Sequence, residues 1–165
     1  MTRRVLVAYG TTNGSTAQLA NAVAEVLREA GLAVETRPAR EVTSLESCDA
    51  VVVGGALYAG RWHRDARRLV HRRRGDLAAR PVWFFSSGPL DASASERDIP
   101  PVRGVRRAMI RVDARGHATF GGRLEQGAKG RMAKMIIDSG KGGDYRDFAA
   151  VRRWATGVAD ELTRG

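Results

Sequence analysis

The stretch RVLVAYGTTNGST, residues 4–16, contains the features that decide the fold. It begins with an unbroken apolar run, which predicts a buried strand over Arg4 to Tyr9. The polar residues that follow include a glycine and predict a loop over Gly10 to Ser15. From Leu19 onward, apolar residues recur every three or four positions, which predicts an amphipathic helix that Gly31 ends. A buried strand, a short loop and a helix are typical of a protein with parallel strands.

The same alternation continues along the chain. Further strands are predicted at Leu32 to Thr36, Ala50 to Val53, Val82 to Phe85 and His117 to Phe120. Two more helices are predicted from apolar stripes, one through Trp62, Ala66, Leu69 and Val70 and one through Phe148, Val151, Ala155, Val158 and Leu162. Strands that alternate with helices pair in parallel and carry helices on both faces, so we expect an α/β fold.

Length and composition favour a single domain that spans residues 1–165, because 43% of the chain is apolar and no low-complexity tract divides it. The apolar run near the start is too short for a signal peptide or a membrane span, so we expect a cytoplasmic protein. The single cysteine, Cys48, excludes an internal disulfide and a cysteine-rich metal site. The three histidines have no metal-ligand spacing, and we expect no metal.

The segment 123–144 is rich in glycine and basic residues and is expected to be a loop or an insertion. An alternative is a helix with an apolar face, formed by Leu124, Ala128, Met132, Met135 and Ile136. Such a helix has two possible places: packed on the domain, or lying on an anionic membrane surface through its basic side.

The net charge of +10 comes almost entirely from arginine. It has three possible meanings: nucleic-acid binding, contact with an anionic membrane surface, or an arginine-rich genome with no functional meaning. We favour the last for most of these residues. No zinc-finger spacing, RNA-binding aromatic signature or basic heptad repeat accompanies the charge, so specific nucleic-acid binding is not expected.

The loop Thr11-Thr12-Asn13-Gly14-Ser15-Thr16 carries the most informative functional signal. A helix N-terminus offers free N–H groups and the positive end of the helix dipole. The hydroxyl groups add donors, and Gly14 lets the backbone approach an oxyanion closely. The loop is neither a Walker P-loop nor a dinucleotide fingerprint, and it suits a phosphate monoester held by neutral donors. The alternative is an ordinary Ser/Thr helix cap with a turn glycine.

Two further loops are expected at the same edge of the sheet. One runs from Gly54 to Trp62 after the third strand, and the other is Ser86-Ser87-Gly88-Pro89-Leu90 after the fourth. Ligands of parallel sheets bind outside the carboxyl ends of the strands. Small residues there would let a flat ring lie against the backbone, with Tyr58 or Trp62 as a stacking partner. Core packing is the favoured role of Trp62.

The chain resembles the flavodoxin family, and within it the flavodoxin-domain proteins related to menaquinone-dependent protoporphyrinogen oxidase. The resemblance rests on the phosphate loop after its strand, on DAVVVGGA at 49–56 and on GGDYRDF at 142–148, and it extends over almost the whole chain. It implies a three-layer fold with a five-stranded parallel sheet in the order 2-1-3-4-5. It also implies FMN as cofactor. The residues that would bind FMN are Thr11, Thr12, Asn13, Gly14, Ser15 and Thr16 at the phosphate, and Ala56, Leu57, Tyr58, Ala59, Gly60, Ser86, Ser87, Gly88, Pro89 and Leu90 beside the ring.

The resemblance implies redox chemistry that belongs to the flavin, so no acid–base residue is predicted. The first hypothesis is a protoporphyrinogen oxidase-like enzyme that passes electrons to a quinone or similar acceptor. Its basic surface would favour a porphyrinogen-like substrate with carboxylates and permit peripheral membrane contact. The second hypothesis is an electron carrier that serves a redox partner protein. The third is a flavin-free binding module. Flavin content would separate the third from the others, and turnover of a porphyrinogen would separate the first from the second.

Overall fold

The computed structural model describes residues 2–12, 14–88, 98–124 and 143–164. Its main sheet contains the parallel strands β1 (Arg4–Gly10), β2 (Ala33–Pro38), β3 (Ala50–Tyr58), β5 (Val82–Ser87) and β6 (Gly116–Phe120). Their spatial order is β2-β1-β3-β5-β6, and the short β4 (Arg61–Trp62) pairs antiparallel with β3. This order is 2-1-3-4-5 for the parallel strands, so the predicted fold class is confirmed.

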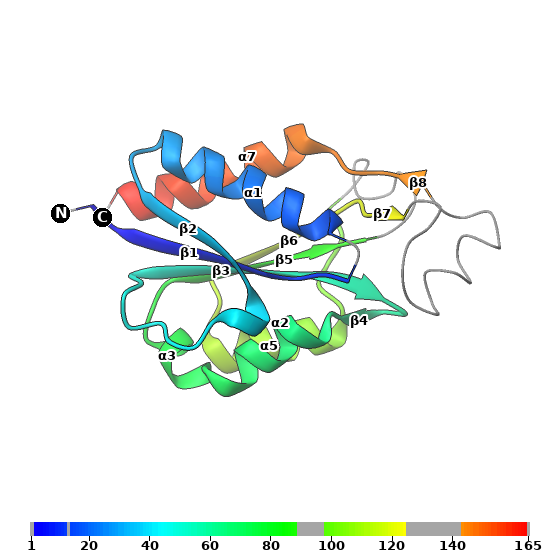
Figure 1. The fold of residues 1–165 in the computed structure, drawn as a ribbon, viewed down its shortest axis with the longest axis horizontal. Coiled ribbons are helices and arrows are strands. Elements are labelled where there is room, and N and C mark those ends of the chain that lie inside the picture. Colours follow the sequence, from blue (N-terminus) through cyan, green and yellow to red (C-terminus); the bar gives the residue numbers. More distant parts are fainter. Residues whose placement is uncertain (1, 13, 89–97, 125–142, 165) are drawn as a thin grey trace.

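Helices cover both faces of the sheet (Figure 1). On one face lie α1 (Ser15–Glu29) and α7 (Phe148–Thr163), which we call the α1–α7 layer. On the other lie α2 (Arg64–Arg72), α3 (Arg74–Ala78) and α5 (Arg103–Val112), which we call the α2–α5 layer. A short 3-10 turn, η1 (Ala39–Glu41), follows β2. Both termini lie at the end of the long axis away from the carboxyl ends of the strands.

Alternate side chains of each central strand enter the two halves of the core. Val5 and Val7 of β1 join the cluster under the α1–α7 layer, whereas Leu6 and Ala8 join the cluster under the α2–α5 layer. In β5, Phe85 belongs to the first cluster and Phe84 to the second in the same way. The strands are apolar on both faces because both faces are covered, which explains the unbroken apolar runs in the sequence.

The third strand is longer than predicted, because it runs through Gly54 and Gly55 to Tyr58. A Cβ on Gly54 would lie 2.0 Å from the Phe85 ring, and one on Gly55 would lie 2.4 Å from Trp62 Nε1. These glycines therefore accommodate aromatic rings on opposite faces of the strand and do not end it. The predicted loop from Gly54 to Trp62 is wrong in this respect, since its first half is strand.

Other boundaries also need correction. The fourth strand extends over Ser86 and Ser87, and Trp62 belongs to β4, with α2 starting only at Arg64. The prediction missed the helices α3 and α5. Of the segment 123–144, the structure describes the two ends, where β7 (Arg123–Leu124) and β8 (Gly143–Asp144) pair antiparallel.

The apolar helix considered within 123–144 lies almost wholly outside the described residues; only Leu124 of its proposed face is described, in the strand β7. Among the helices that the structure describes, none is long and apolar enough to cross a membrane.

Candidate functional site

The N-terminus of α1 is open to a ligand. Gly14 precedes the helix with φ of 84°, a left-handed conformation that favours glycine, and no side chain of the described residues caps the first turn. This turn also lacks acidic residues. The first backbone N–H groups of a helix have no partner within the helix, so they remain available here to an anion.

Thr16, in the first turn of α1, is fully buried, and its hydroxyl oxygen has no hydrogen-bond partner among the described residues. A buried hydroxyl without a partner costs free energy, about 1–3 kcal/mol by comparison with other proteins. A ligand atom that accepted a hydrogen bond from Thr16 would remove this cost. The neighbouring Ser15 is also largely buried.

Among the other helices that begin near this edge, α2 and α7 are capped by a side chain, whereas α5 is not capped by any described residue. The His63 ring nitrogen Nδ1 accepts a hydrogen bond from Asp65 N at 3.1 Å and caps α2. The Asp147 carboxylate accepts from Ala150 N at 3.1 Å and caps α7. In α2 and α7 one N-terminal N–H group therefore donates to a capping side chain, and α1 lacks such a bond within the described part of the chain. The N-terminus of α1 differs from that of α5 in the buried Thr16 hydroxyl, which has no partner among the described residues.

His63 connects the start of α2 to the loop before α1. Its Nε2 lies 3.0 Å from Thr12 Oγ1. Because Nδ1 accepts the bond from Asp65 N, a neutral His63 carries its proton on Nε2 and donates it to Thr12. Burial lowers the pKa of His63 and favours this neutral form. Thr12 then keeps its own proton for another acceptor. Gly10 permits this contact, since a Cβ there would lie 2.9 Å from His63 Nδ1.

Thr11 has a local role in the same loop. Its hydroxyl oxygen accepts a hydrogen bond from Gly14 N at 3.0 Å, which closes the turn before the helix. Of the predicted phosphate residues, the structure thus brings Thr11, Thr12, Gly14, Ser15 and Thr16 together at one helix end. Asn13 lies outside the described residues.

A β-hairpin forms the second wall of the site. Its turn consists of Ala59 and Gly60, both with positive φ, of 51° and 74°. Two consecutive residues with positive φ match the tight turns that follow the natural twist of paired strands. Tyr58 is half-buried, and the centroid of its ring lies 6.5 Å from the centroid of the His63 ring in an edge-to-face arrangement. The predicted ring residues from Ala56 to Gly60 therefore lie on this hairpin, beside the residue that contacts the phosphate loop.

Trp62, in the returning strand of the hairpin, is a core residue. It is only 3% exposed, and its Nε1 donates to Phe85 O at 3.2 Å. Its ring packs against Phe84 at 4.9 Å between centroids. The favoured role of core packing is confirmed, and Tyr58 is the better placed of the two aromatic residues to contact a ligand.

Ser86 and Ser87 lie at the carboxyl end of β5 and are both buried. The Ser86 hydroxyl is 3.0 Å from His117 Nε2, and burial lowers the pKa of His117 to about 4. Gly88 follows with φ of 127°, and its N–H donates to Phe120 O at 2.9 Å. The Ser86 hydroxyl thus has a partner within the sheet. Pro89 and Leu90 lie outside the described residues.

Arg146 is a site residue that the sequence reasoning missed. Its side chain is only 7% exposed, pairs with Asp144 at 2.9 Å and also donates to Gln18 in α1. Hydrogen bonds from Arg146 lower the pKa of Asp144. The guanidinium group also stacks over the Phe148 ring at 5.0 Å. It therefore ties the segment before α7 to the helix that carries the phosphate donors.

The donor set fits FMN at its phosphate end: an uncapped helix N-terminus, two hydroxyl groups and a glycine turn. No loop acid is present to repel the phosphate, and no group of three or more His, Cys, Asp or Glu among the described residues could hold a metal ion.

A family model described as a flavodoxin domain matches residues 6–143. Among solved structures, a mutant flavodoxin from Pseudomonas aeruginosa is similar with a TM-score of 0.64 and 17% identity, covering 98% of this chain and 99% of that one. Oxidised Flavodoxin 2 from Bacillus cereus is similar with a TM-score of 0.63 and 15% identity, covering 98% of each chain.

Rubredoxin oxygen:oxidoreductase from Desulfovibrio gigas also matches, with a TM-score of 0.66 and 12% identity. The match covers 98% of this chain but only 36% of that larger protein. No curated protein matches the chain.

Proposed function

The chain belongs to the flavodoxin-domain family, and from this premise we propose that it binds FMN and transfers electrons through it. The observation that carries the proposal is the buried Thr16 hydroxyl without a partner at the uncapped end of α1. The cofactor supplies the redox chemistry when it is bound, and the protein supplies binding and orientation.

The residues have distinct proposed roles. Thr12 and Thr16 donate their hydroxyl protons to phosphate oxygens, together with N–H groups of the first turn of α1. His63 is a positioning residue, because its Nε2 contact orients the Thr12 hydroxyl. The hairpin around Tyr58 excludes water from one side of the ring. This division gives α1 the phosphate and β3–β4 the ring.

The test is FMN titration of the purified protein, followed by visible absorption after desalting. We expect about one equivalent of retained flavin, and a loss of affinity of about 10- to 100-fold for Thr16→Val, since one charge-assisted hydrogen bond is worth about 1.5–3 kcal/mol. The matched control is Thr156→Val in α7, whose hydroxyl donates to Arg152 O at the protein surface. A protein that retains no added FMN, or equal affinity for both variants, would overturn the proposal.

A second candidate is the protoporphyrinogen oxidase-like reaction, with electrons passing to a quinone or similar acceptor. Arg61 in the hairpin supports it, because a guanidinium group beside the ring would favour a substrate that carries carboxylates. Turnover of a porphyrinogen with a quinone by the FMN-loaded protein would support this reaction. If FMN is retained but no turnover occurs, the protein is a carrier that serves a redox partner.

A further inference from the structure

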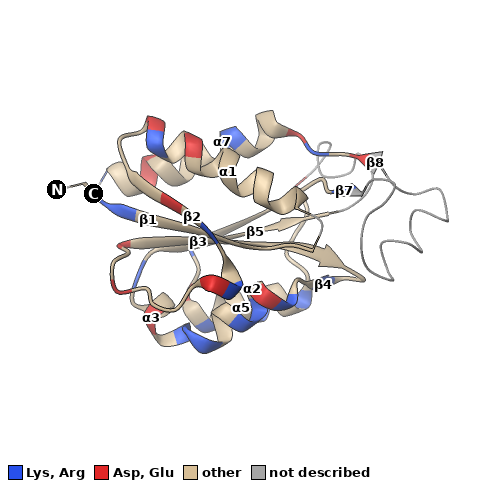
Figure 2. Cartoon of the chain, in the orientation of Figure 1, with Lys and Arg blue, Asp and Glu red and all other residues tan. Residues whose placement is uncertain are grey.

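The positive charge of the chain is concentrated on one helix layer. In the α2–α5 layer, α2 carries four arginines and one aspartate, and α5 carries four arginines and no acid, which give +3 and +4. In the other layer, α1 has one arginine against two glutamates, and α7 has two arginines against two acids, which give −1 and 0. Figure 2 shows the same division between the two faces of the sheet. An arginine-rich genome does not explain such one-sided placement.

The two layers also differ in how their arginines are paired. Arg152 of α7 pairs with Glu29 of α1 at 2.9 Å. In the α2–α5 layer, Arg64 is 4.0 Å from Asp65, and no other arginine of α2 or α5 has an ion-pair partner within the described part of the chain. Crowded, unpaired guanidinium groups repel one another, so this layer has a free-energy cost that an anionic ligand would remove.

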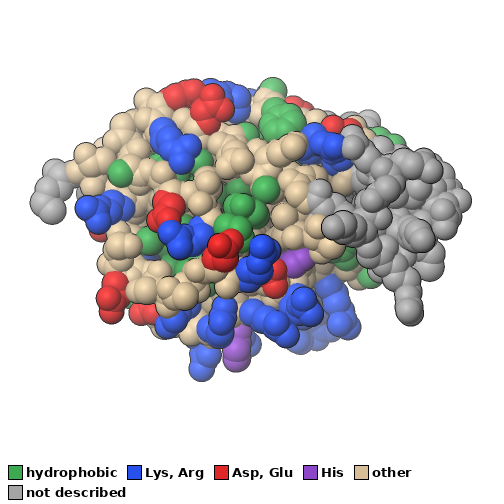
Figure 3. Space-filling view, viewed as in Figure 1, with side chains coloured by type: hydrophobic (Ala, Val, Ile, Leu, Met, Phe, Trp, Pro, Cys, Tyr) green, Lys and Arg blue, Asp and Glu red, His purple; other side chains and the backbone are tan. Residues whose placement is uncertain are grey.

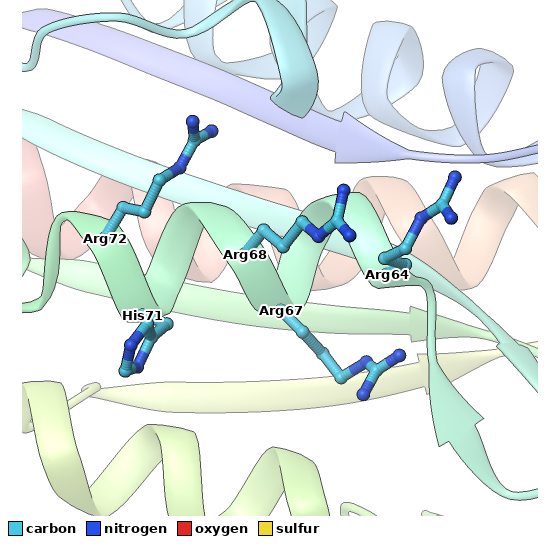
Figure 4. A pocket seen from close by; sticks show the side chains of 5 residues that line it. All are labelled: Arg64, Arg67, Arg68, His71 and Arg72. Atoms are coloured by element: carbon cyan, nitrogen blue, oxygen red, sulfur yellow. The ribbon is translucent and has the colours of Figure 1, made fainter.

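These arginines surround two adjoining hollows. One of about 370 Å³ lies along α2 and is lined by Arg64, Arg67, Arg68, His71 and Arg72. Figure 4 shows Arg67 and His71 on one side of the helix and the other three on the opposite side. The second hollow, of about 410 Å³, is lined by Gly60, Arg61, Trp62, Arg67, Arg103, Gly104 and Arg107. In the space-filling view, basic side chains also gather along the lower part of the molecule, where the α2–α5 layer lies (Figure 3).

The second hollow touches the candidate flavin site. Gly60 and Arg61 belong both to the hairpin and to the hollow. Arg67 links the two hollows, and its Nε donates to Trp62 O at 3.0 Å, which fixes the guanidinium group beside the hairpin. A molecule seated on α2 and α5 would therefore approach the ring side of the site.

An apolar side chain stands among these charges. Ile110 of α5 is 76% exposed, and among the described residues the only other exposed large hydrophobic side chain is Phe148, on the opposite layer. Helical spacing places Ile110 beside Arg106 and Arg107. An apolar centre with an arginine rim is typical of protein–protein interfaces.

We propose that the α2–α5 layer is the docking surface for an acidic protein. Guanidinium groups pair with carboxylates in a bidentate manner, and Ile110 supplies the contact that a bare charge attraction lacks. Single-stranded nucleic acid fits less well, because no aromatic side chain that could stack on a base is exposed on this layer within the described residues. Duplex DNA offers no partner for the exposed Ile110 beyond its charged backbone. A membrane surface fits less well, because one isoleucine gives little apolar insertion. Docking of an acidic protein does not depend on flavin binding. Electron exchange with that protein rests on the proposed function.

The test is binding of the full chain to three anionic probes at about 50 mM salt, where screening is weak. The probes are an acidic plant-type ferredoxin, a duplex DNA and phosphatidylserine vesicles. We expect the ferredoxin to bind most tightly. Arg107→Glu should weaken its binding about tenfold, and Ile110→Ser about fivefold. Arg153→Glu is the matched control, because it makes the same charge change on the exposed side of α7 and should have less than a twofold effect.

Each outcome decides the matter. Equal effects of Arg107→Glu and Arg153→Glu, or unchanged binding in Ile110→Ser, would reduce the surface to non-specific attraction and overturn the proposal. Tighter binding to DNA or to vesicles would overturn it in favour of that ligand, and so would no ferredoxin binding below about 100 µM. The flavin content of each variant is measured separately, so failure to dock is distinguishable from failure to bind FMN.

Discussion

The two helix layers are alike in packing and different in charge. Each covers one face of the sheet with a buried apolar cluster. In the α1–α7 layer Arg152 pairs with Glu29 and Glu25, and the charges of the two helices nearly cancel. This layer also contains the uncapped end of α1. In the α2–α5 layer His63 caps α2, and Arg64 alone among the arginines of α2 and α5 has an ion-pair partner within the described residues. A net charge summed over the chain hides this difference, because one layer is nearly neutral.

The proposed division of roles between the two helix layers would fail most clearly if the phosphate of FMN were bound outside α1. Replacing Ser15→Asp places a carboxylate in the first turn of α1. A carboxylate there gains from the helix dipole but loses hydration, because Ser15 is largely buried, so the free energy of unfolding is measured beside FMN affinity. It also repels a phosphate, so FMN affinity should fall by about 100-fold or more. Fluorescence titration with FMN checks this, with Thr156→Asp on the exposed side of α7 as the control that adds the same charge and leaves FMN affinity unchanged. Undiminished binding by Ser15→Asp would move the phosphate site elsewhere.

Two glycine substitutions test whether the layers are equally well packed. Gly54→Ala presses on Phe85 under the α1–α7 layer, and Gly55→Ala presses on Trp62 under the α2–α5 layer. Each should lower the free energy of unfolding by about 2–3 kcal/mol, because a rigid ring must move in a filled core. Urea denaturation measures both. A loss well below 1 kcal/mol for only one variant would show that its layer packs loosely.

Acid sensitivity should depend on the buried histidines and not on the arginine layer, since arginine stays charged. The pKa of His117 is about 4 in the folded protein, below the ordinary value of about 6.5. The unfolded chain therefore takes up the proton first. The contribution of His117 should be complete above about pH 7.5, and stability should fall by about 3 kcal/mol as the pH drops to about 4.

Urea midpoints measured between pH 7 and pH 4 check this expectation. His117→Gln should flatten the pH dependence, while Thr156→Gln, an exposed substitution in α7 that removes no titratable group, should leave it as in the parent protein. The same slope in all three proteins would assign the acid sensitivity to other groups.

The smallest expected effect has opposite signs in the two layers. Arg152→Gln removes the pairs with Glu29 and Glu25, so it should lower stability by about 0.5 kcal/mol. Arg107→Gln removes one charge from an unpaired cluster, so it should raise stability by about 0.3 kcal/mol. Melting temperatures at low salt measure both, and the difference should shrink at high salt. Losses of equal size would mean that the arginines of α5 are not under repulsion.

Much of the fold could be predicted because its signals are local. The strand at Arg4, the loop after it and the stripe of α1 depend only on neighbouring residues. The helix α5 was missed because four arginines among ten residues conceal its core residues, Val105 and Val112. Their spacing of seven is the signal that would have found it.

Features that depend on distant residues could not be predicted. A glycine pair in a sequence is typical of a turn, and only the rings of Phe85 and Trp62 show why Gly54 and Gly55 continue the strand. The contact between Thr12 and His63 joins residues 51 positions apart, and that between Gln18 and Arg146 joins residues 128 apart. Sequence reasoning predicted the loop residues at the start of α1, but not His63 and Arg146, which contact Thr12 and Gln18.

The basic helices contain arginine and no lysine, and this choice fixes how their field can be controlled. A guanidinium group does not lose its proton at any pH that a cell reaches. The positive electrostatic potential over α2 and α5 therefore persists when the solution becomes more acidic or more alkaline. Dissolved ions weaken this potential by screening, with a screening length of about 8 Å at physiological ionic strength. The attraction between this surface and an acidic partner should therefore vary with ionic strength and not with the charge state of the arginines.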